Sequence, residues 1–173
     1  MPRTKPPLKL LIIEDNPGDA VLFQAFFKQD RRRSEFFHVS DGEEALQFLY
    51  KEGAHTGSPR PDIIVVDINL PRIDGKDLVR EIKNNDSLRS IPVIVFTSSE
   101  SEEDIRQCYA SGANCVLIKA ADVDGASHIF ELMESFWINA VHLPTSSDPV
   151  ADLPRDVLMR SSIGPADSAR HGC

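Results

Sequence analysis

Five short apolar segments, separated by stretches with helical periodicity, constrain the fold of this chain more than any other feature. The first, third and fourth are rich in β-branched residues and do not alternate with polar residues, as expected of parallel strands covered on both faces. Strands that alternate with helices predict right-handed crossovers and a doubly wound α/β sheet. We therefore predict five parallel strands in the order 2-1-3-4-5. The segments are Leu8–Ile13, Phe36–Ser40, Asp62–Ile68, Ile91–Thr97 and Cys115–Ile118.

Helix start signals lie between these segments. Asn16 followed by Pro17 is typical of an N-cap with proline at the first helical position. Asp41 and Glu44 form a capping-box pattern for a second helix that ends near Gly53. Three further helices are expected, the first after Gly75, the second after Ser101, and a longer third from Asp122 or Asp124 to between residues 137 and 143.

Carboxylates follow two of the predicted strands. Glu14 and Asp15 end the first strand and Asp67 ends the third, on either side of the point where the strand order reverses. Like charges a few ångströms apart repel by several kcal/mol at intermediate dielectric, so such a site needs a proton or a counter-ion. Mg²⁺ fits these oxygen ligands best. Glu14 and Asp15 alone would more simply be part of a turn, and only their pairing with Asp67 favours a metal site.

A hydroxyl and an ammonium complete the set at the same edge of the sheet. Thr97 ends the fourth strand and Lys119 follows the fifth. Each alone would be an ordinary strand-end residue. Together, a carboxylate, a divalent metal, a hydroxyl and a lysine are what phosphoryl transfer to an aspartate requires, because its catalysis is mostly positioning and charge stabilisation.

The whole pattern resembles the receiver domain of two-component response regulators, which have a flavodoxin-like (βα)5 fold. The resemblance covers residues 8–143 and implies that Asp67 is the phosphoacceptor. It also implies that Thr97 bonds the phosphoryl oxygen and that Lys119 pairs with it. The motifs that carry the resemblance are Glu14-Asp15, the segment from Asp67 to Gly75 that includes Pro71 and Asp74, Thr97-Ser98, and Lys119.

The same resemblance implies the ligands of a magnesium ion. Asp15 and Asp67 would bind it directly, together with the main-chain carbonyl of Asn69. Glu14 would act through a water molecule. Asp74-Gly75 is more simply a turn, and we keep it so.

Three local strings are similar to small regulators paired with bacterial and cyanobacterial phytochromes. They are NPGDAVLF, GSPRPDIIVVDINLP and ELMESFWINAVHLP. This narrower likeness implies that the phosphoryl donor is a sensor histidine kinase of the bacteriophytochrome type. A histidine phosphotransfer protein or a downstream target protein would then receive the signal.

Two positions depart from the usual receiver pattern. Lys119 is followed by Ala120-Ala121, where most receivers have a proline after a cis peptide bond, so we expect a trans path for this loop. Val116 stands where many receivers carry an aromatic residue that rotates on phosphorylation. Switching is therefore expected to rely on the loop after the fourth strand, where Ser99 and Glu100 lie.

The chain divides into a receiver domain, residues 1–143, and a flexible tail, residues 144–173, rich in Pro, Ser, Asp and Gly. A tail of this size is too short for a DNA-binding or enzymatic output module. The last predicted helix carries more apolar residues than one face can bury, which favours a homodimer through this region. They include Ile129, Leu132, Met133, Phe136, Trp137, Ile138, Val141 and Leu143.

Composition excludes several other classes. Nineteen basic against 27 acidic side chains give a net charge of −8, which argues against nucleic acid as a partner. No apolar stretch approaches a membrane span, and three cysteines without a paired motif predict reduced thiols in the cytoplasm. We expect a signalling protein and not an enzyme. The alternative, a small-molecule phosphatase acting through an aspartyl phosphate, would ordinarily carry a second acid at the position of Asn69.

Overall fold

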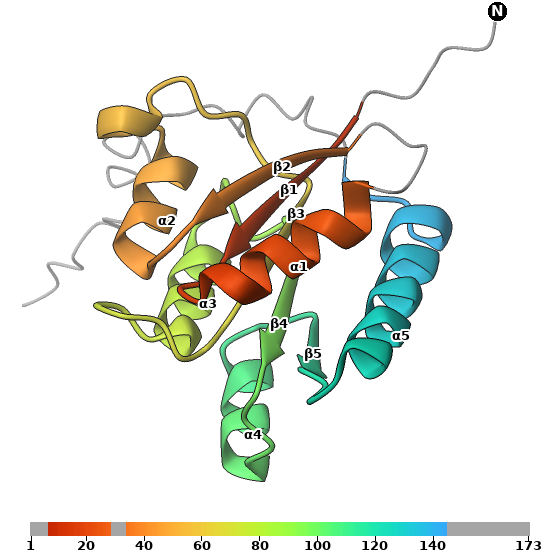
Figure 1. Ribbon diagram of the computed structural model, residues 1–173. Coiled ribbons are helices and arrows are strands. Elements are labelled where there is room, and N and C mark those ends of the chain that lie inside the picture. The colour runs from red at the N-terminus through yellow and green to blue at the C-terminus, as the bar shows by residue number, and fades with distance from the viewer. Residues whose placement is uncertain (1–6, 29–33, 145–173) are drawn as a thin grey trace, which may run out of the picture.

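Parallel strands form the centre of the molecule, and helices cover both of their faces (Figure 1). The computed structural model describes residues 7–28 and 34–144, and within them one five-stranded sheet has the order β2-β1-β3-β4-β5. The predicted fold and strand order are therefore confirmed. The strands are β1 (Leu8–Ile13), β2 (Ser34–Val39), β3 (Ile63–Val66), β4 (Val93–Thr97) and β5 (Cys115–Ile118).

Alternate residues of the central strands supply two separate apolar cores. One side of the sheet packs against α2 (Gly42–Tyr50), α3 (Gly75–Asn84) and α4 (Glu102–Ala110). The other packs against α1 (Pro17–Lys28) and α5 (Val123–Met133). Burial on both faces explains why these strands lack polar alternation. The first core includes Leu11, Ile13, Ile64, Val66, Val93 and Val95, and the second includes Leu10, Ile12, Ile63, Val65, Ile94 and Phe96.

Side-chain caps begin the helices at the predicted residues. The Asn16 side chain accepts the Gly18 N–H at 2.9 Å, and Asp41 accepts the Glu44 N–H at 2.9 Å. The Glu44 carboxylate bonds back to the N–H of Ser40 and not to that of Asp41. Asp122 caps α5, which decides between the two predicted starts. The α2 helix ends at Tyr50, with Lys51 in the left-handed conformation, so the end predicted near Gly53 was slightly late.

The chain continues past α5 as a π-helical segment, Glu134–Ala140, which agrees with the predicted end of the last helix. Phe130 and Met133 are buried in the second core. Leu132 and Phe136 are each 57 % exposed, so the predicted apolar excess on this helix is present. The predicted tail lies, apart from Pro144, outside the described residues.

Candidate functional site

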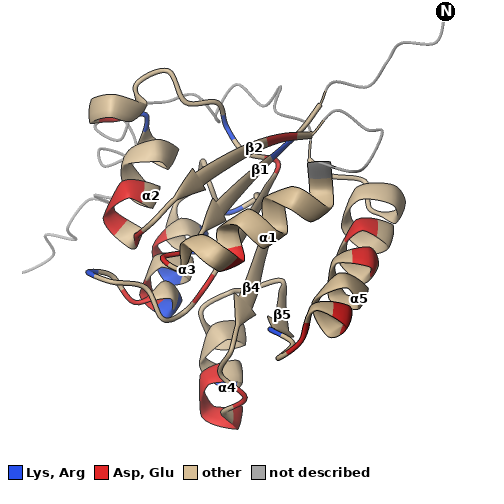
Figure 2. Cartoon of the chain, in the orientation of Figure 1, with Lys and Arg blue, Asp and Glu red and all other residues tan. Residues whose placement is uncertain are grey.

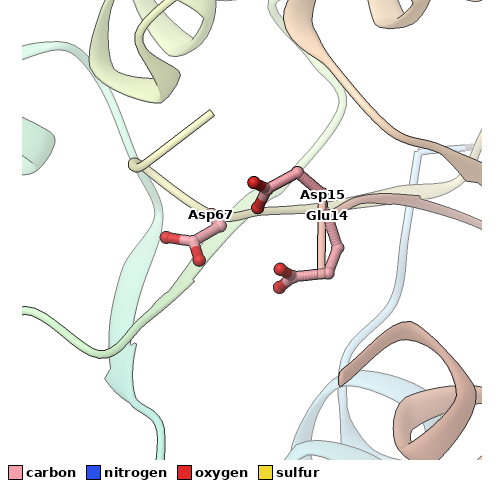
Figure 3. Close-up of side chains that lie close together, drawn as sticks. All are labelled: Glu14, Asp15 and Asp67. Atoms are coloured by element: carbon pink, nitrogen blue, oxygen red, sulfur yellow. The ribbon is translucent and has the colours of Figure 1, made fainter. Parts of the chain in front are cut away.

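Neighbouring strands bring three acidic residues together at the carboxyl-end edge of the sheet (Figure 3). Glu14 and Asp15 follow β1, and Asp67 follows β3, whose Val66 is in register with Ile13. The Asp67 N–H donates to the Ile13 carbonyl at 3.1 Å, so the ladder between the two strands continues to the acidic residue itself. The sheet thus positions the backbone of the site directly.

Carboxylate oxygens from Glu14, Asp15 and Asp67 lie within 4.8 Å of one another. Glu14 and Asp67 are buried, whereas Asp15 is exposed. Burial raises the pKa of the Glu14 carboxyl above its usual value, although the Lys119 ammonium and the Asn16 N–H oppose this shift. Three hard oxygen donors at this spacing fit a divalent cation.

The Lys119 ammonium lies among carboxylates. It donates to Asp67 Oδ2 at 2.7 Å, Glu14 Oε2 at 2.7 Å and Asp19 Oδ2 at 2.9 Å. The Lys119 side chain is only 12 % exposed. Burial alone would lower the pKa of this lysine, but the three carboxylates outweigh it and raise the pKa well above its usual range. Lys119 is therefore a cation at neutral pH.

Thr97 and Asn69 reach the site from the two neighbouring strand ends. Thr97 is buried, its carbonyl accepts the Lys119 N–H at 2.8 Å, and its hydroxyl oxygen accepts the Ser99 N–H at 3.2 Å. Asn69 is exposed, and its N–H donates to Asp67 Oδ1 at 3.1 Å. The loop after each of these strands is thus hydrogen-bonded to a side chain of the candidate site.

Gly75 permits the close return of the chain behind Asp67. A Cβ at this position would lie 2.2 Å from the Asp67 carbonyl oxygen and 2.5 Å from the Ile68 Cα, both of them backbone atoms. The Gly75 N–H donates to the Ile68 carbonyl at 2.9 Å, and Asp74 caps α3. The turn predicted here is present, and it also shapes the backbone at Asp67.

The two departures noted in the sequence have clear structural counterparts. The peptide bond after Lys119 is trans, as predicted for Ala120. The N–H of Val116, on strand β5 at the edge of the sheet, donates to the Tyr109 hydroxyl of α4 at 3.3 Å. The phenol that interacts with this strand therefore comes from a helix.

Geometry brings Glu14, Asp15, Asp67 and Lys119 together and places Thr97 and Asn69 at the same edge. Sequence reasoning missed two contributors, Asp19 and the steric role of Gly75. Asp19 occupies the first turn of the helix that follows Glu14-Asp15, which was the available signal. The signal for Gly75 was the Asp74-Gly75 pair after a buried strand.

The chain belongs to the response regulator receiver domain family, whose model matches residues 10–130. Its fold is that of a response regulator receiver.

Similarity to particular relatives indicates a narrower group within this family. The response regulator Rcp1 of Synechocystis sp. is 36 % identical over 143 residues, which cover 83 % of this chain and 97 % of Rcp1. A crystal structure of Rcp1 with bound Mn²⁺ matches with a TM-score of 0.77 at 37 % identity, over 80 % of this chain and all of that one. The phosphorylated cyanobacterial phytochrome response regulator RcpA matches with a TM-score of 0.78 at 35 % identity, over 81 % and 100 %. The predicted resemblance to phytochrome-associated regulators is thus confirmed.

Across 7–28 and 34–144, no helix is both long enough and apolar enough to cross a bilayer.

Proposed function

We propose that Asp67 accepts a phosphoryl group from a sensor histidine kinase and that the protein signals through phosphorylation-dependent contacts. The observation that carries this proposal is the Asp67 carboxylate itself. It is buried, it lies beside two further acids, and one of its oxygens is 2.7 Å from the Lys119 ammonium.

In the reaction, a carboxylate oxygen of Asp67 attacks phosphorus while the bond from phosphorus to the donor nitrogen or oxygen breaks, and the leaving group keeps the bonding electrons. Lys119 offers a positive charge to the transferred group, which gains negative charge around its oxygens. The Thr97 hydroxyl lies at the same edge and would bond a phosphoryl oxygen. The product is an acyl phosphate on Asp67.

We include Mg²⁺ in this proposal. Asp15, Asp67 and the Asn69 carbonyl would hold it, with Glu14 acting through water. The carboxylates of Glu14, Asp15, Asp19 and Asp67 outnumber the Lys119 ammonium with which they cluster, and this charge imbalance favours a divalent cation. When bound, the ion would neutralise charge on the phosphoryl oxygens.

The first experiment is incubation with Mg²⁺ and acetyl phosphate, followed by intact mass spectrometry. We expect a gain of one phosphoryl group that is absent from Asp67→Asn. No gain in the unaltered protein would overturn the proposal. We propose no turnover of small substrates, in line with the signalling relatives; sustained hydrolysis of a phosphate ester would instead support the phosphatase.

The kinase that we propose is a red-light-sensing bacteriophytochrome, since the relative RcpA is described as a phytochrome response regulator. A histidine phosphotransfer protein or a downstream target would receive the signal. Phosphotransfer to this chain that changes between red and far-red illumination would support the assignment. The cytoplasmic location expected from the unpaired cysteines belongs to the same proposal.

We propose that the signal leaves through the loop between β4 and α4. The Thr97 hydroxyl holds the Ser99 N–H, and the Ser99 hydroxyl donates to Asp104 of α4 at 2.7 Å. Lys76 of α3 donates to the other oxygen of Asp104 at 2.8 Å. A shift of Thr97 toward a phosphoryl group would therefore pull on α4 without an aromatic residue at position 116.

The homodimer through the C-terminal helical region is also a proposal. Leu132 and Phe136 supply its exposed apolar side chains, and Figure 2 shows acidic residues along the same helix. Light scattering at micromolar concentration should give a dimer mass, which Phe136→Ser should reduce. A monomer before and after phosphorylation would overturn it.

A further inference from the structure

Lys119 has a third carboxylate partner that the receiver pattern does not include. Asp19, in the first turn of α1, accepts a hydrogen bond from the ammonium at 2.9 Å. Its side chain is 36 % exposed, against 5 % for Glu14 and 6 % for Asp67. Asp19 is thus the partner of Lys119 that has most access to water.

Helix capping does not account for this position. The Asn16 side chain already accepts the N–H groups of Gly18 at 2.9 Å and of Asp19 at 3.4 Å. An acid in the first turn would gain a modest benefit from the helix dipole wherever it pointed. The Asp19 carboxylate instead bonds a lysine 100 residues further along the chain.

The ammonium of Lys119 has three hydrogens, and three carboxylates accept them. A phosphoryl oxygen at Asp67 must compete for these hydrogens with Glu14 and Asp19, the two partners that remain carboxylates. Glu14 is held by a second bond, because its other carboxylate oxygen accepts the Asn16 N–H at 3.1 Å. Asp19 has the longest of the three bonds and the most exposed side chain, so water can best replace Lys119 there.

We propose that Asp19 is a positioning residue that competes with the phosphoryl group for Lys119. This inference rests on the proposed function, in which Asp67 is the acceptor. Asp19 holds the ammonium toward α1 while Asp67 is unmodified, and it adds a negative charge close to the incoming phosphoryl dianion. It weakens phosphoryl binding by both effects, and the same charge strengthens the binding of a cation.

Replacement of Asp19 should therefore change two affinities in opposite directions. In Asp19→Asn, we expect the affinity for Mg²⁺ alone to fall about threefold, because one nearby negative charge is lost. The affinity for beryllofluoride, a phosphoryl mimic, at saturating Mg²⁺ should rise about fivefold, because repulsion falls and Lys119 is released. Isothermal titration calorimetry measures both.

Two further variants separate positioning from a structural effect. Asp77→Asn removes another first-turn acid, one that pairs with Arg80 at 2.6 Å on the surface of α3, and should leave both affinities unchanged. Asp19→Glu keeps the charge and should return both affinities toward those of the unaltered protein.

Unchanged affinities in Asp19→Asn, or a fall in both, would overturn the role of Asp19 while leaving Asp67 as the acceptor. Failure of the unaltered protein to bind beryllofluoride with Mg²⁺ would overturn the proposed function, and the inference with it. A return of both affinities in Asp19→Glu supports the proposal, and no return in that variant counts against it.

Discussion

Two lysines, one at the carboxyl-end edge of the sheet and one at the amino-end edge, have contrasting hydrogen-bond partners. Lys119, beyond the carboxyl end of β5, donates to three carboxylates. Lys83 of α3 donates to the carbonyls of Arg89 and Ile91 and to the side-chain oxygen of Asn114, at 3.1, 2.7 and 2.9 Å, beside the amino ends of β4 and β5. Each ammonium therefore has three oxygen partners, but only those of Lys119 are charged.

The pKa values of the two lysines move in opposite directions. Carboxylates raise the pKa of Lys119 in spite of burial, whereas burial lowers the pKa of Lys83 to about 8. Neutral carbonyls satisfy an ammonium geometrically but do not offset its desolvation as carboxylates do. The Lys119 cluster therefore holds charges that a bound ligand can rearrange, whereas the Lys83 contacts join α3 to the two loops before β4 and β5.

Each edge also has a glycine that gives room to its key residue. Gly75 makes room for the backbone of Asp67, and Gly112, at φ +100°, lies against the Lys83 side chain. The obstacle to a Cβ is rigid backbone at Gly75 and a flexible side chain at Gly112. The following predictions test this contrast.

Gly75→Ala should have the largest effect, because a Cβ 2.2 Å from the Asp67 carbonyl oxygen can be accommodated only by moving backbone. We expect the free energy of unfolding to fall by roughly 3 kcal/mol or more. Gly112→Ala is the matched control and should cost roughly 1–2 kcal/mol, chiefly from its positive φ. Urea denaturation measures both, and a larger loss in Gly112→Ala would contradict the contrast.

Lys119→Met should lower the free energy of unfolding by about 3 kcal/mol when a chelator is present, because it leaves buried carboxylates without their cation. Millimolar Mg²⁺ should restore part of this loss, since the ion can neutralise the same groups. Thermal and urea unfolding with and without Mg²⁺ test this. A loss that is the same in both conditions would show that Lys119 does not act as the counter-ion.

Lys83→Met should cost only about 1 kcal/mol, because the hydrogen bonds that it removes are to neutral carbonyl oxygens. Mg²⁺ should not change this cost. The measurement is the same pair of urea titrations. If Mg²⁺ restored the stability lost in Lys83→Met, the contacts of Lys83 would be coupled to the carboxylate cluster at the other edge, contrary to this expectation.

The last prediction concerns the pH dependence of stability that arises from Lys83. Above pH 8 the folded protein releases the Lys83 proton, whereas the unfolded chain keeps it until about the ordinary value of 10.5. The unfolded state then binds more protons, so stability rises with pH across this window. The unaltered protein should therefore gain stability relative to Lys83→Met between pH 8 and 10. A constant or shrinking difference would show that the pKa of Lys83 is not lowered.

Local patterns were sufficient to predict much of this molecule. Apolar runs gave the strands to within a few residues, and cap residues such as Asn16 and Asp41 gave the helix starts. Glu14, Asp15, Asp67, Thr97 and Lys119 were predicted because each directly ends or follows a strand of a parallel sheet. Parallel strands place such residues at one edge wherever they occur in the chain.

The parts that the sequence did not predict depend on contacts between distant segments. Asp19 was missed because its partner Lys119 is 100 residues away, and a first-turn acid has an adequate local explanation. The Ser99, Asp104 and Lys76 connection joins two helices whose relative placement no local pattern describes. The sequence around Lys83 did not indicate a lowered pKa, because this side chain is buried only when α3 packs against the loops before β4 and β5.

For the residue at the centre of the site, the sequence by itself determined that Asp67 follows a buried strand and faces the end of another. Hydrophobic periodicity and strand-end position are properties of short segments, so they can be read without coordinates. Only the tertiary structure decided that Lys119 divides its three hydrogen bonds among Asp67, Glu14 and Asp19. That division depends on distances between side chains in or after four different elements, β1, α1, β3 and β5, and only packing sets those distances.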